Sequence, residues 1–164
     1  MATTTSLTQA QLATLKASMA ANTAADFVPL RTAGNTGGMA AWYNVYATPA
    51  YYTWQYNYPP QEIWNAMSLD GLGLSNLLQA DSRALMPWAD YYHDMGNVDV
   101  RNGVDDMCGT QTGLASLIIN GAKITTRRGE VLYATGNGAI ATPSTAGYVG
   151  TISNQNVVDA LLMP

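Results

Sequence analysis

The fold is decided most clearly by one stretch near the start of the chain, Leu7-Thr8-Gln9-Ala10-Gln11-Leu12-Ala13-Thr14-Leu15. Thr8 and Gln11 have the spacing of a capping box, in which each side chain accepts a hydrogen bond from the backbone N–H of the other residue. Leu7 and Leu12 stand at the two positions of a hydrophobic staple. Apolar residues then continue at helical spacing through Leu15 and Met19. This pattern predicts a helix over residues 8–21.

The rest of the chain predicts a small helical bundle of the all-α class. Helices are expected over residues 39–46, 61–67, 75–95, 99–107 and 110–128. Pro87 should kink the longest of them, because its ring displaces one backbone hydrogen bond. Residues 22–38 are expected to form a loop, residues 51–58 an extended segment and residues 70–73 a turn. Long strands that alternate with helices are missing from the pattern, which argues against a parallel sheet.

The C-terminal part changes character after residue 134. Residues 135–151 carry almost no charge and no helical period, so they predict an extended Gly/Thr-rich arm that can include a short β hairpin. A last short helix is expected after Ser153 as its cap. The sequence thus predicts a helical body over residues 1–134 and an arm with a docking helix over residues 135–164. The apolar face of that helix is the expected contact with another protein, through Val157, Val158, Leu161 and Leu162.

Composition points to a protein whose surface is covered by neighbours. Charged residues make up 11% of the chain, whereas soluble globular proteins have about 25%. The net charge of −4 gives no basic footprint for nucleic acid. An acidic wall would suit a conduit along which DNA passes without binding. A neighbour-covered exterior is therefore expected, with no sequence-specific DNA contact.

Other features of the chain argue for assembly in the cytoplasm. Cys108 is the only cysteine, so no intrachain disulfide is expected, and a free thiol suits a reducing cytoplasm. Residues 1–5 lack the charged and apolar regions of a secretion signal. No apolar run approaches the ~20 residues that a membrane helix needs. We expect a protein with no membrane association.

The sequence contains few features that indicate a catalytic site. The only histidine, His93, is predicted to lie on the 75–95 helix without a nucleophile beside it, so a surface or interface role is expected. Asp90 and Asp94 are spaced to share a face of that helix, which favours a solvated acidic surface over a cation site. The segment from Gly71 to Asn76 lacks the third glycine of a dinucleotide loop. We therefore expect no enzyme activity, no cofactor and no metal.

A dense aromatic segment leaves three interpretations open. It comprises Trp42, Tyr43, Tyr46, Tyr51, Tyr52, Trp54, Tyr56 and Tyr58. These rings could form a corner of the core, or a protein–protein contact in which Tyr51, Tyr52, Trp54, Tyr56 and Tyr58 take part, because Tyr and Trp supply rigid area with a polar tip. A carbohydrate-binding platform is the third interpretation and the least favoured.

The order of several motifs resembles a family of small tailed-phage virion proteins, the head–tail connector or adaptor proteins. The resemblance spans nearly the whole chain. It is carried by the opening Leu7-to-Lys16 stretch, Pro49 with Tyr52-Thr53-Trp54, Glu62-Ile63, the run from Arg127 to Gly138, Thr142-Pro143, Val149-Gly150, Ile152-Ser153 and Asn156-Val157-Val158.

This resemblance implies a structural protein at the neck of the virion, assembled in the host cytoplasm. Proteins of this kind form a ring, usually of twelve copies, that docks beneath the portal protein and presents a platform to a tail, stopper or nozzle protein. Genomic DNA passes through the ring. Another structural role in the virion, such as head completion, a stopper or a tail terminator, is the alternative within the same class.

Overall fold

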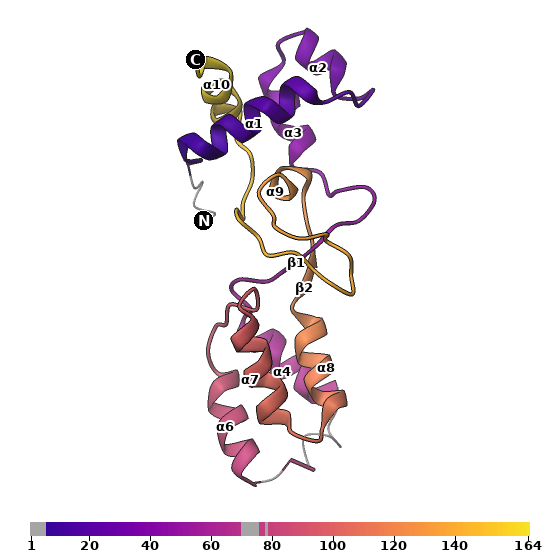
Figure 1. Cartoon of the computed structure of the whole chain (residues 1–164), viewed down its shortest axis with the longest axis vertical. Helices are drawn as coiled ribbons and strands as arrows, with labels where there is room; N and C mark the ends of the chain where they lie inside the picture. Colours follow the sequence, from indigo (N-terminus) through magenta and orange to yellow (C-terminus); the bar gives the residue numbers. More distant parts are fainter. Residues whose placement is uncertain (1–5, 70–75, 78) are drawn as a thin grey trace. The chain divides into compact units, whose positions relative to one another are not determined.

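The structure, a computed structural model, describes residues 6–69, 76–77 and 79–164, and it is mostly helical with one two-stranded sheet (Figure 1). The expected turn at residues 70–73, the glycine-rich segment from Gly71, the apolar positions Leu74 and Leu78 and the N-terminal residues 1–5 lie outside the described residues. The elements are given in chain order: α1 (Gln9–Ala21), α2 (Val28–Thr32), α3 (Thr36–Tyr43), β1 (Tyr52–Trp54), α4 (Pro60–Leu69), α6 (Gln79–Ala89), α7 (Val98–Cys108), α8 (Thr112–Gly121), β2 (Lys123–Thr125), α9 (Arg128–Val131) and α10 (Asn154–Leu162).

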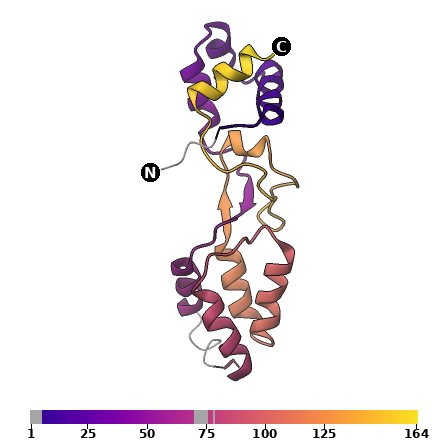
Figure 2. The same cartoon turned by 90° about the vertical axis from the view of Figure 1, so that its left-hand side faces the viewer.

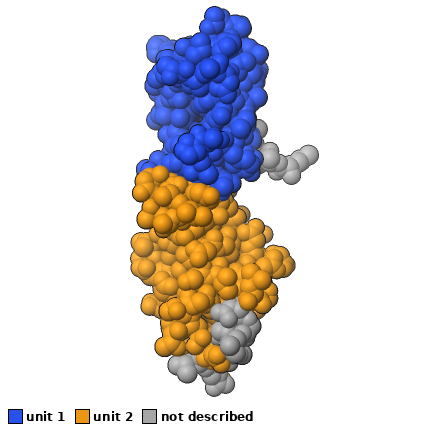
Figure 3. All heavy atoms as spheres, turned by 90° about the vertical axis from the view of Figure 1, so that its right-hand side faces the viewer, with its two compact units in different colours: residues 1–51, 125–136, 146–164 blue, residues 52–124, 137–145 orange. Residues whose placement is uncertain are grey.

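The chain divides into two compact units, and each combines segments that are distant in the sequence (Figure 3). Unit 1 comprises residues 1–51, 125–136 and 146–164, and unit 2 comprises residues 52–124 and 137–145. Each unit has its own buried apolar cluster. This division differs from the predicted one into residues 1–134 and 135–164, because the C-terminal segment supplies residues to both units.

Unit 1 confirms the predicted N-terminal helix. Thr8 caps α1, and the capping box with Gln11 is complete. Leu15 and Met19 are fully buried, as the apolar stripe predicts. At the other end of α1, the Arg31 guanidinium donates hydrogen bonds to the carbonyl oxygens of Met19, Ala20 and Asn22, which would otherwise lack partners at a helix terminus.

The predicted loop over residues 22–38 is wrong in part, because it contains α2 and the start of α3. Pro29 lies in the first turn of α2, where its missing N–H costs no hydrogen bond. The Asn35 side chain accepts a hydrogen bond from the Gly38 backbone N–H and so starts α3 three residues before the predicted helix. That helix ends at Tyr43 rather than at residue 46.

The terminal helix α10 packs in unit 1 against α1 and α3. Ser153 caps it and forms a capping box with Asn156, which confirms the predicted start. The side chain amide of Asn44, directly after α3, pairs with the backbone of Ile152. α10 is therefore part of the core of unit 1 and is not a separate peg.

The described residues of unit 2 include helices α4, α6, α7 and α8 and most of the two-stranded sheet (Figure 2). α4 packs on α8, and α7 packs on both α6 and α8. β1 pairs with β2, whose last residue is counted with unit 1. The extended segment at residues 51–58 is thus observed as a short strand with irregular flanks. Helices close to the predicted ones over residues 61–67 and 99–107 are present as α4 and α7.

Two long helices of the prediction are shorter in the structure. α6 contains Pro87 but ends at Ala89, and His93 instead pairs through its backbone with Tyr58. The predicted 110–128 helix ends at Gly121, and the chain continues as β2 and α9. Thr110 is not its cap, because Gln111 holds that position. Arg127 and Arg128 begin α9 and do not lie at the C-terminal end of α8.

The segment over residues 135–151 has no helix, as predicted, but it also has no β hairpin, and it is packed in place. Ser144 forms a bridge with Thr53 in unit 2 and is buried. In unit 1 the ring of Tyr148 is buried and meets the ring of Tyr133 edge-to-face at 5.5 Å. Glu130 accepts hydrogen bonds from two backbone N–H groups, those of Arg127 and Gly150, each at 3.0 Å. These contacts correct the expectation of an extended arm.

Candidate functional site

Of the four α10 residues predicted to bind a partner, one is buried, one is half-buried and two are exposed. Val157 is fully buried in the core of unit 1, and Val158 is half-buried. Leu161 and Leu162, in the last turn, are 46% and 78% exposed. The expectation for Val157 is therefore corrected, because its side chain is already packed within its own unit. Leu161 and Leu162 remain available to another protein.

The aromatic residues over 51–58 do not form one exposed belt. Tyr58 is fully buried and Trp54 is nearly so, whereas Tyr51 and Tyr52 are half-buried and Tyr56 is exposed. The guanidinium of Arg101 lies 4.4 Å from the centre of the Trp54 ring, and the Lys123 ammonium lies 5.5 Å from it. Both distances are within the range of a cation–π contact. The Trp54 ring is therefore covered, and it does not offer the open face that a sugar needs for stacking.

His93 has a structural role in unit 2. Its ring stacks on Trp88 with 3.8 Å between the ring centres, and its Nε2 lies 2.7 Å from the Trp88 carbonyl oxygen. Because α6 ends before His93, Asp90 and Asp94 do not share a helix face as predicted. Asp90 accepts a hydrogen bond from the indole N–H of Trp64, and Asp94 accepts one from the Gly96 backbone N–H.

Titratable groups in the core are held in their neutral forms. Burial raises the pKa of the Cys108 thiol to about 11, with smaller contributions from Asp105 and Asp81. Burial also raises the pKa of Tyr58 to about 12. In the described residues no group of three or more His, Cys, Asp or Glu side chains is arranged to hold a metal ion. The same part of the chain contains no helix with the length and apolar content of a membrane span.

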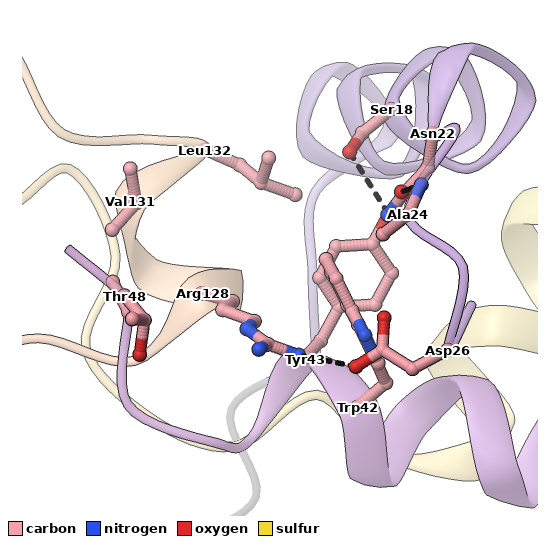
Figure 4. Close-up of a pocket in the computed structure, with 11 residues that line it drawn as sticks. Ser18, Asn22, Ala24, Asp26, Trp42, Tyr43, Thr48, Arg128, Val131 and Leu132 are labelled. Carbon is pink, nitrogen blue, oxygen red and sulfur yellow. Dashed lines mark hydrogen bonds and ion pairs between the residues drawn. The ribbon is translucent and has the colours of Figure 1, made fainter.

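A pocket of about 310 Å³ opens in unit 1 between α1, α3 and α9 (Figure 4). Its apolar wall comes from Trp42, Tyr43, Ala24, Ala47, Val131 and Leu132. Phe27 packs edge-to-face against both Trp42 and Tyr43, which fixes the two rings. The Tyr43 hydroxyl is 2.8 Å from the Ser18 hydroxyl, so the base of the pocket is rigid.

The polar side of this pocket combines one cation, one carboxylate and an indole N–H. The Arg128 guanidinium lies 4.2 Å from the centre of the Trp42 ring, and its Nη1 is 3.6 Å from the Asp26 Oδ2. The Nε1 of Trp42 is buried, and none of the described residues accepts a hydrogen bond from it. It nevertheless makes the largest contribution to lowering the pKa of the nearby Asp26 carboxyl, and Arg128 lowers it further.

The pocket could not be predicted from the sequence, because its residues come from three separate segments, 18–26, 42–48 and 128–132. The sequence pattern placed Trp42 and Tyr43 in the aromatic segment and Arg128 at the end of the predicted 110–128 helix, and neither pattern connects these residues with Asp26. A second pocket of about 350 Å³ lies in unit 2, lined mainly by α4 and α8, with the buried Tyr58 hydroxyl at its wall.

Comparisons with known proteins give no relative from which a role could be inferred. No protein-family model matches the chain, no curated protein matches it, and no solved structure matches it.

Proposed function

We propose that the protein is a structural subunit of a tailed-phage particle, a head–tail adaptor that works as part of a ring beneath the portal protein. The observation that carries the proposal is the end of α10. Capping by Ser153 and burial of Val157 fix this helix in unit 1, and its last turn holds Leu161 and Leu162 at the surface. A fixed helix with exposed leucines suits a groove on another protein, because little ordering is needed on binding.

The balance of charge and exposed apolar area supports the same role. Single exposed apolar residues are ordinary in soluble proteins. Here they accompany a charged fraction of only 11% and occur in both units, as Tyr46, Tyr56, Leu69, Tyr91, Tyr92, Ile140 and Leu162. Neighbouring subunits in a closed ring would cover such positions through repeated side-by-side contacts. Helices α4, α6, α7 and α8 of unit 2 would supply the small bundle that gives each subunit a rigid body.

In this proposal the ring has about twelve copies, as resembling proteins do, and joins the portal to a tail, stopper or nozzle protein. The net charge of −4 would let genomic DNA pass without being held. Assembly would occur in the host cytoplasm, and the mature location would be the neck of the virion.

The test uses two lysine substitutions on the same helix. Leu162→Lys should abolish the complex with purified portal protein, because it places a charge in an apolar contact. The positive charge at the C-terminal end of α10 should leave the fold intact. Gln155→Lys is the matched control, since it adds the same charge to an exposed position of α10 next to Asp159. Native mass spectrometry with portal protein measures both.

Portal binding by wild type and by Gln155→Lys, with loss in Leu162→Lys, is the expected result. Equal binding by all three proteins would remove α10 from the interface. Absence of any wild-type complex with portal would exclude the adaptor role and leave the alternative virion roles, namely a head-completion, stopper or tail-terminator protein.

A further inference from the structure

The pocket between α1, α3 and α9 contains a buried hydrogen-bond donor that is not satisfied by the described residues. The Trp42 indole N–H has no hydrogen-bond partner in the described part of the chain, although its nitrogen is buried. An indole can only donate, and the nearby Asp26 carboxylate does not lie in hydrogen-bonding geometry with it, so an oxygen of a ligand could satisfy this N–H. A buried donor without an acceptor is uncommon in proteins.

The N–H donors of the Arg128 guanidinium are also only partly engaged. Its side chain is 23% exposed, and within the described residues its guanidinium has one ionic partner, Asp26, at 3.6 Å. A well-formed pair between a guanidinium and a carboxylate is shorter, at about 2.7–2.9 Å, and often uses two parallel N–H groups. Stacking on Trp42 holds the guanidinium at the pocket and leaves its edge free to donate.

Asp26 shows which chemical group these donors attract. Its carboxylate faces both Arg128 and the Trp42 indole, as Figure 4 shows, and the two groups lower the pKa of that carboxyl. However, the Asp26 side chain is 63% exposed and stays beyond ideal pairing distance. It lies at the mouth of the pocket, where an incoming carboxylate could replace it.

The apolar lining of the pocket determines which group the carboxylate of a ligand can carry. Trp42, Tyr43, Ala24, Val131 and Leu132 supply an apolar lining, and the volume of about 310 Å³ accommodates a small body such as one benzene ring or a short alkyl chain. A phosphate dianion fits less well, because one arginine would face two charges with Asp26 close by.

We propose that this pocket binds a small apolar monocarboxylate, with Arg128 and the Trp42 N–H as donors to the carboxylate and Asp26 displaced from Arg128. The carboxylate belongs either to a free organic acid or to the apolar C-terminal residue of a peptide. The inference goes beyond the proposed function and does not depend on it.

The test is a titration of the full chain with benzoate, followed through the indole N–H signals in a ¹⁵N–¹H NMR spectrum. The four tryptophans give separate signals, and Trp42→Phe identifies the one that matters. Benzoate should shift the Trp42 signal in a saturable manner. Benzamide, which has the same shape without charge, should not shift it.

Three substitutions then separate the roles of Arg128 and Asp26 in benzoate binding. Arg128→Gln should weaken benzoate binding about tenfold or more, because a hydrogen bond to a charged group is lost. Asp26→Asn should strengthen binding several-fold, because the competing carboxylate is removed. Arg127→Gln is the matched control, since it removes a neighbouring charge whose residue does not line the pocket, and it should leave the affinity unchanged.

The gain in Asp26→Asn is the sharpest outcome, because a variant that merely damages the fold cannot produce it. A Trp42 signal that does not move at any benzoate concentration overturns the proposal. So does an equal shift in wild type and Arg128→Gln, or a loss of binding in Asp26→Asn. A short peptide with a C-terminal phenylalanine, compared with its amidated form, distinguishes a peptide source from a free acid: tighter binding of the free-carboxyl peptide than of benzoate assigns the peptide.

Discussion

The side chain amide of Asn44 forms a pair of hydrogen bonds with the backbone of Ile152. Its Nδ2 donates to the Ile152 carbonyl oxygen at 2.9 Å, and its Oδ1 accepts from the Ile152 N–H at 2.8 Å. The two residues are 108 positions apart in the chain. This pair joins the end of α3 to the residue before the cap of α10, so it connects the first and last parts of unit 1.

Replacing Asn44 should therefore destabilise unit 1. Asn44→Ala removes both hydrogen bonds and leaves two backbone groups of Ile152 without their partner. We expect a loss of about 2 kcal/mol in the free energy of unfolding, at ~1 kcal/mol for each bond. Urea denaturation followed by tryptophan fluorescence measures it. Asn154→Ala, at an exposed position of α10, is the control and should change stability by less than ~0.5 kcal/mol.

The C-terminal helix should be required for folding as well as for any docking. Val157→Ala creates a small cavity beside Ala160, both fully buried, and should cost about 2 kcal/mol. Leu162→Ala, at a position 78% exposed, should cost little. Removal of residues 153–164 should accordingly lower the melting temperature of unit 1, measured by circular dichroism. A truncated protein with unchanged helical signal and melting temperature would show that α10 does not belong to this core.

The phenol of Tyr58 should be dispensable for stability. Its hydroxyl is buried and makes no hydrogen bond with residues 6–69, 76–77 and 79–164. A buried polar group without a partner is unfavourable by ~1–3 kcal/mol. Tyr58→Phe should therefore leave stability unchanged or raise it by about 1 kcal/mol in urea denaturation. A marked loss of stability would mean that the hydroxyl has an acceptor.

Gly121, the last residue of α8, should tolerate a side chain only when the Tyr58 hydroxyl is removed. A Cβ at Gly121 would lie 2.4 Å from that oxygen. Gly121→Ala should therefore be destabilising in wild type and markedly less so in Tyr58→Phe. A double-mutant cycle measures the coupling, which should be on the order of 1 kcal/mol. Additive effects of the two substitutions would show that the helix end moves to relieve the contact.

Alkaline pH should unfold the protein through its buried tyrosines. Burial raises the pKa of Tyr58 to about 12, and it also raises the pKa of Tyr43, Tyr133 and Tyr148. An unfolded tyrosine loses its proton near pH 10. The stabilising contribution of each neutral phenol is thus fully present below about pH 10 and is lost as pH rises through the folded pKa.

Between about pH 10 and pH 12, the free energy of unfolding should fall with a slope of roughly 1 kcal/mol per pH unit from Tyr58 alone. Denaturation curves at several pH values measure the slope. Tyr58→Phe should reduce it over this range, while an exposed-site variant, Tyr91→Phe, should not. Identical slopes in all three proteins would show that deprotonation of Tyr58 does not cause the loss of stability.

Features that depend on neighbouring residues were predictable from the sequence. The helix after Thr8 was predicted with its capping box and the helix after Ser153 with its cap, because a cap is a hydrogen bond between groups three residues apart. Leu15 and Met19 were identified as core for a similar reason, since helical spacing alone puts them on one face.

The failures have a common origin in long-range pairing. The apolar pattern around Leu114 and Ile124 is compatible with one continuous helix. β2 forms instead because its backbone pairs with β1, about seventy residues earlier in the chain. His93 left the predicted helix because its backbone exchanges hydrogen bonds with that of Tyr58. Neither partner can be identified from local periodicity.

By itself, then, the sequence determined the low charge, the mostly helical character and the two capped helices at the ends of the chain, because these depend on composition and on contacts within a turn or two. Only the tertiary structure decided that α10 is core on one side and surface on the other. It also decided that Asp26, Trp42 and Arg128 share a pocket. Such contacts bring together residues that are far apart in the chain, which costs conformational entropy. Burial of apolar surface by many residues offsets that cost, so no local pattern predicts which residues meet.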